Sequence, residues 1–287
     1  MSALPLPAAP ASSPVPPLGL PGGLTLPVGR TAIMGILNVT PDSFSDGGRY
    51  TDAQAALRHA REMVAAGADL IDVGGESTRP NSTRISADEE WARICVIVES
   101  LAADGIVVSV DTLHASTARE AARAGAAIIN DVSGGRWDPE MNAAVAQSGC
   151  AYVVQHYRAL PGMPGEHFDY GDDLVGTLIE RVGSQVQDAI DAGVTADKIV
   201  VDPGLGFSLT GDQCWQILRE LPRFAQGGYP VLVGASRKRF VKALEGDVDA
   251  NSADIAAYCA AAGAWAVRVH DVAATVAAIA RKENDVD

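Results

Sequence analysis

Short apolar runs rich in Val and Ile recur along the chain, and polar residues or glycine follow each of them at once. We interpret eight such runs as β-strands, at residues 32–37, 70–73, 106–110, 126–129, 151–154, 199–201, 230–233 and 264–269. The segments between them space their apolar residues as a helix does, as at Ala56, Leu57, Ala60, Met63 and Val64. The chain therefore predicts a strand followed by a helix, repeated eight times.

The number of these units decides between two parallel-sheet architectures. Strands that are apolar on both faces and alternate with helices indicate a parallel sheet covered by helices. Eight units between residues 32 and 269 favour an α/β fold closed as a (β/α)8 TIM barrel, and the absence of GxGxxG after the first strand weakens the doubly wound alternative. Glycines that predict helix C-caps precede seven strands: Gly67, Gly105, Gly125, Gly149, Gly193, Gly228 and Gly263.

The first 29 residues differ in composition from the rest of the chain. They contain eight of the sixteen prolines and no charged residue, so they are poorly suited to a helix or a sheet ladder. We expect a Pro-rich disordered extension at residues 1–29, a single barrel domain at 30–283 and a short tail at 284–287.

The overall charge and the cysteines exclude several classes of protein. With 22 basic and 36 acidic residues the net charge is −14, which argues against a nucleic-acid binder or a protein held on anionic lipid. No apolar run reaches the roughly 18 to 20 residues that cross a bilayer. The four cysteines are far apart and form no CxxC pair, which favours a reduced, cytoplasmic protein.

Polar residues stand where each predicted strand ends, which is where a barrel of this kind places its chemistry. A single Asp or Asn there is commonly only the N-cap of the next helix, and His270 could also be a structural hydrogen-bonding residue. Eight polar ends around one rim favour a binding site instead. In chain order they are Asn38, residues 74–80, Asp111, Asn130 and Asp131, Gln155 and His156, Asp202, Ser236 to Lys238, and Arg268 with His270.

The charges are distributed unevenly around this rim. Acceptor groups follow the third, fourth and sixth strands, whereas cations gather after the seventh and eighth, where barrels often bind phosphate. A carboxylate there would suit a neutral heterocycle with an amidine-like edge, because two parallel N–H donors match two oxygens. The pattern predicts a ligand with a donor-rich end and an anionic end.

Two long loops leave the same rim, at residues 39–50 and 77–86. Both are rich in Pro, Gly, Asp and Ser. Such loops either act as lids over a reacting centre or are passive surface loops, and composition alone leaves both readings open.

Seven blocks of sequence, in order along residues 31–280, carry a resemblance. They are MGILNVTPDSFSDGG (34–48), DVGGESTRP (72–80), SVDT (109–112), INDVSGG (129–135), VDPGLGF (201–207), GASRKRF (234–240) and RVHDV (268–272). Together they resemble the bacterial form of the dihydropteroate synthase family of folate biosynthesis. The resemblance implies a cytoplasmic, homodimeric transferase that condenses 6-hydroxymethyl-7,8-dihydropterin diphosphate with 4-aminobenzoate, with Mg²⁺ as cofactor, to give 7,8-dihydropteroate and diphosphate.

The resemblance also implies roles for individual residues. The pterin would contact Asp111, Asn130, Asp202 and Lys238, with Asp202 on its guanidine-like edge; the diphosphate would contact Asn38, Arg268 and His270, with Mg²⁺ near Asn38. Thr78, Arg79, Pro80 and Asp46 would close over the 4-aminobenzoate side, and Phe207 and the segment from Ser236 to Arg239 would line its pocket, where sulfonamides compete. The expected catalytic residues are Asp46, Lys238, Arg268 and His270.

Two departures and two alternatives accompany this reading. Gln155 stands where the family usually carries Met, and GASRKRF lacks the Phe-Gly insertion of sulfonamide-resistant relatives, which predicts a drug-sensitive enzyme. One alternative is a pterin-barrel methyltetrahydrofolate methyltransferase, which has no need of the Arg268 and His270 anion site. The other is a non-catalytic paralogue that binds pterin.

Overall fold

Eight parallel strands form the centre of the protein, as the sequence predicted. The computed structural model describes residues 6, 17–40, 48–77 and 82–284. Each strand pairs with its neighbours in the order β6-β5-β4-β3-β2-β1-β8-β7. The strands are β1 (Ala32–Asn38), β2 (Leu70–Gly74), β3 (Val107–Asp111), β4 (Ile128–Asp131), β5 (Ala151–Gln155), β6 (Ile199–Asp202), β7 (Leu232–Val233) and β8 (Ala266–Val269).

The barrel closes between β6 and β7 through a minimal contact. Val201 and Val231 form a single parallel bridge, and the Val201 N–H donates to the Pro230 carbonyl at 2.9 Å. The sequence predicted a seventh strand over residues 230–233, but the regular ladder covers only Leu232–Val233. Pro230 has no N–H to give to a ladder, which accounts for the shorter strand. The predicted (β/α)8 barrel is confirmed, including its closure.

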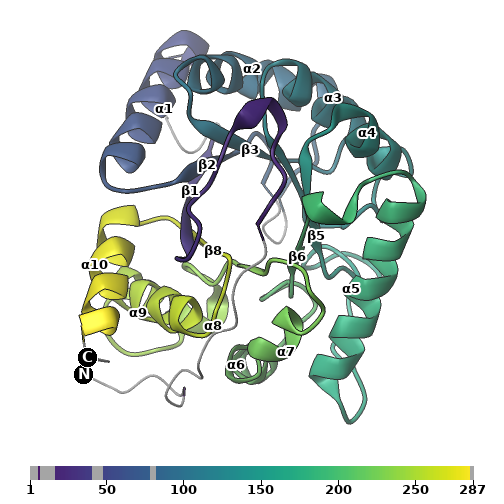
Figure 1. Ribbon diagram of the computed structural model, residues 1–287, viewed down its shortest axis with the longest axis vertical. Helices are drawn as coiled ribbons and strands as arrows, with labels where there is room; N and C mark the ends of the chain where they lie inside the picture. The colour runs from purple at the N-terminus through teal and green to yellow at the C-terminus, as the bar shows by residue number, and fades with distance from the viewer. Residues whose placement is uncertain (1–5, 7–16, 41–47, 78–81, 285–287) are drawn as a thin grey trace.

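Helices surround the strands on all sides in Figure 1. The α-helices are α1 (Gly48–Ala65), α2 (Ala87–Ala103), α3 (Ala115–Arg123), α4 (Met141–Ser148), α5 (Leu174–Asp191), α6 (Gly211–Arg219), α7 (Pro222–Ala225), α8 (Arg239–Lys242), α9 (Val248–Ala261) and α10 (Val272–Asn284), and short 3₁₀ turns occupy Pro21–Gly23 and Ala196–Lys198. All seven glycines expected at helix ends have φ between 72° and 108°, the left-handed region that lets the chain turn back into the next strand. None of the helices in the described part of the chain is long and apolar enough to cross a membrane.

The apolar core has two parts. The larger part lies between the outer faces of the strands and the helices and includes Ile71, Val110 and Leu178. The smaller part fills the inside of the barrel at the N-terminal ends of the strands, with Met34 and Leu70 among its fully buried members. Because this interior is packed, polar chemistry is confined to the other end of the barrel.

Residues 17–29 lie against the barrel rather than apart from it. Leu18, Leu20, Leu24 and Leu26 are half-buried on the inner apolar cluster, and the Gly19 N–H donates to the Asp197 carbonyl at 2.8 Å. The disorder predicted for residues 1–29 therefore does not hold for this part. The proline content indicated a lack of regular secondary structure. It gave no sign that leucines in the same segment can cover the apolar end of the barrel.

Shortening two of these leucines should destabilise the whole barrel. We expect Leu24→Ala combined with Leu26→Ala to lower the free energy of unfolding by about 2 kcal/mol, because two half-buried side chains lose their apolar contacts. Urea denaturation followed by circular dichroism measures the change. Val28→Ala is the matched control, since Val28 is 83% exposed in the same segment and should cost almost nothing. Equal stability of the two variants would contradict the packing role.

Candidate active site

A cavity of about 700 Å³ opens at the C-terminal ends of the strands, where the sequence placed the site. The structure brings nine of the predicted residues together in its lining: Asn38, Asp111, Asn130, Asp202, Phe207, Ser236, Lys238, Arg268 and His270. Arg239 and Gln155 also line it. The other predicted positions, Asp46, Thr78, Arg79 and Pro80, lie outside the described residues.

Arg268 occupies the middle of the site and is held by two carboxylates. Its Nε donates to Asp72 Oδ2 at 2.6 Å and its Nη2 donates to Asp111 Oδ2 at 2.9 Å. Burial alone would lower the pKa of this guanidinium, but Asp72 and Asp111 outweigh burial and raise it. Arg268 is therefore a permanent cation whose plane is fixed by a two-point grip.

The pKa of Asp111 is raised chiefly by burial, and its neighbouring carboxylates add to the effect. Burial raises its pKa to about 7, against the opposing attraction of Arg268 and with a further contribution from Asp72. The carboxyl group is thus poised between its two protonation states near neutral pH, so it can accept hydrogen bonds as an anion or donate one as an acid.

Asp202 and Lys238 face each other at the ends of β6 and β7. Asp202 is 5% exposed, and its Oδ1 accepts a hydrogen bond from the Gly204 N–H at 2.7 Å. Burial raises the pKa of Asp202, opposed chiefly by Lys238, while burial lowers the pKa of Lys238 to about 8. Lys238 Nζ donates to the Leu205 carbonyl and lies 5.0 Å from the Phe207 ring centroid.

A strained turn after β7 presents the cationic segment. Arg237 has a φ of 56°, which is uncommon for a residue with a side chain. Its guanidinium holds Asp249 of α9 through two hydrogen bonds of 2.6 and 2.9 Å, and its N–H donates to Ser252 Oγ. These bonds hold the turn, so that Ser236, Arg237 and Lys238 all line the cavity.

His270 and Ser236 form a connected pair on the same side. The Ser236 Oγ and His270 Nδ1 are 2.9 Å apart, and the His270 N–H donates to Ser236 Oγ at 3.3 Å. The pair joins the ends of β7 and β8. Both readings of His270 in the sequence analysis, structural hydrogen bonding and a place in the site, are compatible with this geometry.

Two acidic residues received no role of their own in the sequence analysis: Asp72, and Glu76, which was counted only as one of the polar residues after the second strand. Asp72 is fully buried within β2, and Glu76, at the end of that strand, lines the cavity. Glu76 Oε1 accepts from the Ile85 N–H at 2.9 Å, and Glu76 Oε2 lies 3.5 Å from His114 Nε2. The signal for Asp72 was an aspartate inside an otherwise apolar strand, since an unpaired charge is rarely buried.

The side-chain oxygen of Asn38, at the end of β1, suits a divalent cation whose other ligands are water and phosphate oxygens. Asn38 Oδ1 lies near the end of β2, 3.8 Å from where a Cβ on Gly74 would stand, whereas the neighbouring Asp111 Oδ2 already accepts from Arg268. Among the described residues no group of three or more His, Cys, Asp or Glu could form a metal cage. Mg²⁺ commonly takes one or two protein oxygens together with phosphate and water, so the donor set fits it.

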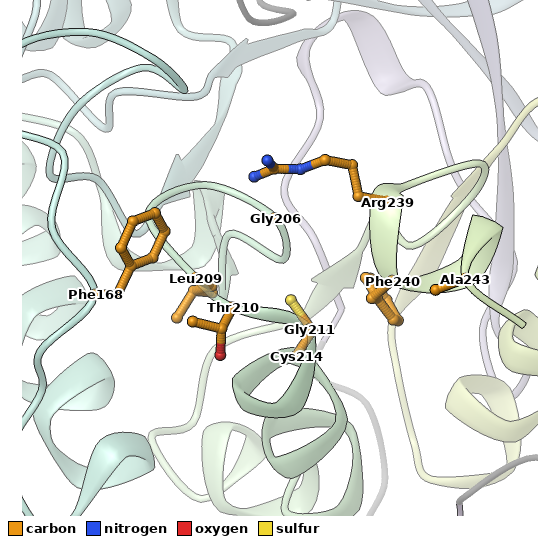
Figure 2. A pocket seen from close by; sticks show the side chains of 9 residues that line it. All are labelled: Phe168, Gly206, Leu209, Thr210, Gly211, Cys214, Arg239, Phe240 and Ala243. Carbon is orange, nitrogen blue, oxygen red and sulfur yellow. The ribbon is translucent and has the colours of Figure 1, made fainter.

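A second cavity of about 390 Å³ adjoins the first, and both are lined by Gly206 and Arg239. Figure 2 shows its mainly apolar walls, formed by residues such as Phe168, Cys214 and Phe240. Arg239 reaches from the start of α8 toward the side on which Phe168 lies. The two cavities therefore share one cation, Arg239, in their linings.

Comparisons with known proteins agree with this geometry. A family model described as pterin binding enzyme matches residues 34–270. The dihydropteroate synthase of Mycobacterium leprae is 46% identical over 258 residues, which cover 86% of this chain and 90% of the relative. The chain therefore belongs to the pterin-binding enzymes and, within them, to the dihydropteroate synthase family.

Solved structures give the same result. The Yersinia pestis dihydropteroate synthase with a sulfonamide drug complex has a TM-score of 0.85 at 38% identity, covering 92% of this chain and 98% of that one. The Xanthomonas albilineans enzyme with 4-aminobenzoic acid has a TM-score of 0.82 at 39% identity, with coverage of 92% and 95%. The same enzyme in complex with 7,8-dihydropteroate has a TM-score of 0.81 at 37% identity, with coverage of 92% and 97%.

Anion binding in this site should weaken as Lys238 loses its proton. The pKa of Lys238 is lowered to about 8, so the side chain is cationic below that pH and neutral above it. Sulfate is a suitable probe because its own charge is constant, and we expect its affinity to fall about tenfold from roughly pH 7 to pH 9.5 in calorimetric titrations. In Lys238→Gln the affinity at pH 7 should be weaker and its fall over the same range should be smaller, because the Asp111 carboxyl, with a pKa of about 7, still gains charge there while residue 238 no longer loses any. An unchanged affinity in the parent protein would contradict this assignment.

Proposed function

We propose that this chain catalyses the condensation of 6-hydroxymethyl-7,8-dihydropterin diphosphate with 4-aminobenzoate, giving 7,8-dihydropteroate and diphosphate. The observation that carries the proposal is a single cavity whose lining holds both buried acceptors, Asp202 and Asn130, and cations, Lys238 and Arg268. A pterin diphosphate has the matching polarity, with an N–H-rich ring edge and an anionic group. The membership of the chain in the dihydropteroate synthase family supports the same reaction.

The acceptor side accounts for recognition of the ring. Asp202 is buried and could accept two parallel N–H bonds from the guanidine-like edge of the pterin, the strongest arrangement available to a carboxylate. Asn130 is 4% exposed and Asp111 stands beside it in the sheet register. These three residues would hold the ring and leave its methylene carbon toward the cationic side.

The cationic side accounts for departure of the leaving group. The reaction breaks the carbon–oxygen bond to diphosphate and forms a bond from that methylene carbon to the arylamine nitrogen, which then loses a proton. Arg268 and His270 would bind the diphosphate and stabilise the charge that develops on it as the bond breaks, and Lys238, assigned to the pterin, would add to the positive charge of the same cavity. Mg²⁺, held near Asn38 and by the phosphate oxygens, would supply further neutralisation when bound.

The arylamine side is formed by Phe207 and the segment from Ser236 to Arg239. Phe207 offers an aromatic wall to the larger cavity, and Arg239 lines both cavities. We assign the 4-aminobenzoate to this side and expect sulfonamides to compete there. Asp46, Thr78, Arg79 and Pro80 would complete it from the two loops. We further propose a homodimer in the cytoplasm, with the barrel domain beginning near residue 30.

The direct test is the reaction itself. Purified protein incubated with pterin diphosphate, 4-aminobenzoate and Mg²⁺ should form 7,8-dihydropteroate, identified by mass spectrometry after chromatography. Added EDTA should lower the rate if Mg²⁺ takes the role proposed for it. A yield no greater than that of the mixture without protein would show that the proposed function is wrong.

Asp202 gives a sharper test of the recognition step. We expect Asp202→Asn to weaken binding of 6-hydroxymethylpterin by about 1 to 3 kcal/mol in calorimetry, because a charge-assisted pair is lost. Asp173→Asn is the control, since Asp173 pairs with Arg223 on the surface and is absent from the cavity lining. The control should bind as the parent does. Equal affinities in all three proteins would refute the role of Asp202.

A further inference from the structure

Asp72 lies beneath the cavity and not in its wall. It occupies the middle of β2, is 0% exposed, and is absent from the residues that line the cavity. Burying a carboxylate is costly unless it is paired, so a residue in this place needs a physical reason. The reason lies in the two groups that it contacts.

One oxygen of Asp72 receives two hydrogen bonds from opposite parts of the barrel. Asp72 Oδ2 accepts from Arg268 Nε at 2.6 Å and from Asn130 Nδ2 at 3.1 Å. Strand β2 pairs with β1 and β3, whereas Arg268 is on β8 and Asn130 on β4. These contacts therefore run through the interior of the barrel and tie alternate strands together.

The interior side chains of alternate strands form a layer in such barrels. Here β2, β4, β6 and β8 contribute Asp72, Asn130, Asp202 and Arg268. Two residues earlier, the same strands contribute Leu70, Ile128, Val200 and Ala266 to the apolar interior. Asp72 is thus part of the first polar layer above a dry floor, and its three partners in the layer are proposed site residues.

The contact with Asn130 fixes the direction of its amide. A carboxylate without a proton can only accept, so Asn130 must turn its NH₂ group toward Asp72. Its carbonyl oxygen is then the group left for the cavity. Asn130 therefore offers the ligand a hydrogen-bond acceptor. An acceptor suits the N–H-rich edge of a pterin and does not suit a ligand edge that carries only acceptors.

The contact with Arg268 fixes the direction of the guanidinium. Asp72 and Asp111 together take Nε and Nη2, the two donors on one edge of the fork. The opposite end of the group is directed away from this grip. Asp72 thus acts on two site residues through one oxygen atom, without a place in the cavity wall.

We propose that Asp72 is a positioning residue: it sets the hydrogen-bond direction of Asn130 and the orientation of Arg268, and so makes the site selective for a ligand edge made of donors. The inference rests on the proposed pterin-binding function. It adds that selectivity is set by a residue of this layer that does not itself line the cavity.

A double-mutant cycle tests the coupling, with the affinity for 6-hydroxymethylpterin measured by calorimetry. In Asp72→Asn, residue 72 can donate as well as accept, so the direction of the Asn130 amide is no longer fixed. In Asn130→Asp, two carboxylates face each other at this contact. Each change should weaken pterin binding about tenfold or more. The combined variant, Asp72→Asn with Asn130→Asp, restores one donor and one acceptor at the contact, with the carboxylate now facing the ligand as an acceptor. It should bind at least about tenfold more tightly than Asn130→Asp alone.

A matched control separates positioning from general stability. Thr117 is also buried, but its hydroxyl donates to the Ala87 carbonyl and the residue is absent from the cavity lining. Thr117→Val should lower the melting temperature and leave pterin affinity within about twofold of the parent. In the Asp72 variant, the KM for pterin diphosphate should rise while the KM for 4-aminobenzoate changes less than about twofold.

Each outcome has a defined meaning. Parent-like pterin affinity in Asp72→Asn, or a combined variant no better than Asn130→Asp, would overturn the inference. If Asp72→Asn does not fold, the comparison of Asn130→Asp with the combined variant decides on its own. Failure of the parent protein to bind 6-hydroxymethylpterin would instead show that the proposed function is wrong.

Discussion

Charge compensation inside the barrel is the constraint on which the site depends. Three carboxylates, Asp72, Asp111 and Asp202, share the interior with two cations, Arg268 and Lys238. Burial in a region of low dielectric makes this imbalance costly, and the cost is visible in the pKa of Asp111, which rises to about 7. An arriving ligand with N–H donors and a metal-neutralised diphosphate would meet acceptors and cations that are already oriented, so little rearrangement is needed at the moment of reaction.

The position of these charges follows from the architecture. The floor of the barrel is filled by side chains such as Met34 and Leu70, so polar residues can be hydrated and reached only at the opposite rim. Along β2, Asp72 stands two residues before Gly74, and the missing side chain of Gly74 leaves Asn38 and Asp111 as neighbours at the end of the strand. The strained turn at Arg237 directs Lys238 into the cavity. This turn follows β7, which is joined to β6 by a single bridge between Val201 and Val231.

Much of this could be predicted from the sequence. The recurrence of short apolar runs predicted the eight strands, and glycines before seven of them predicted the helix ends. Both could be predicted because each depends on nearby residues: apolar runs form strands, and the left-handed turn at a helix end favours glycine. The polar strand ends identified nine residues that line the cavity. Asp72 could not be assigned in the same way, since its role depends on contacts with β4 and β8 across the interior, which no local pattern encodes. The packing of residues 17–29 escaped prediction for a related reason: composition describes the segment but not the apolar surface that receives it.

The covered floor has a consequence for traffic through the molecule. Leu18, Leu20, Leu24 and Leu26 add a lid of apolar side chains to an end of the barrel that is already packed. The interior is therefore closed at this end, and the large cavity of the described residues lies at the opposite one. In a two-substrate reaction, both substrates and the product would share that single end of the barrel.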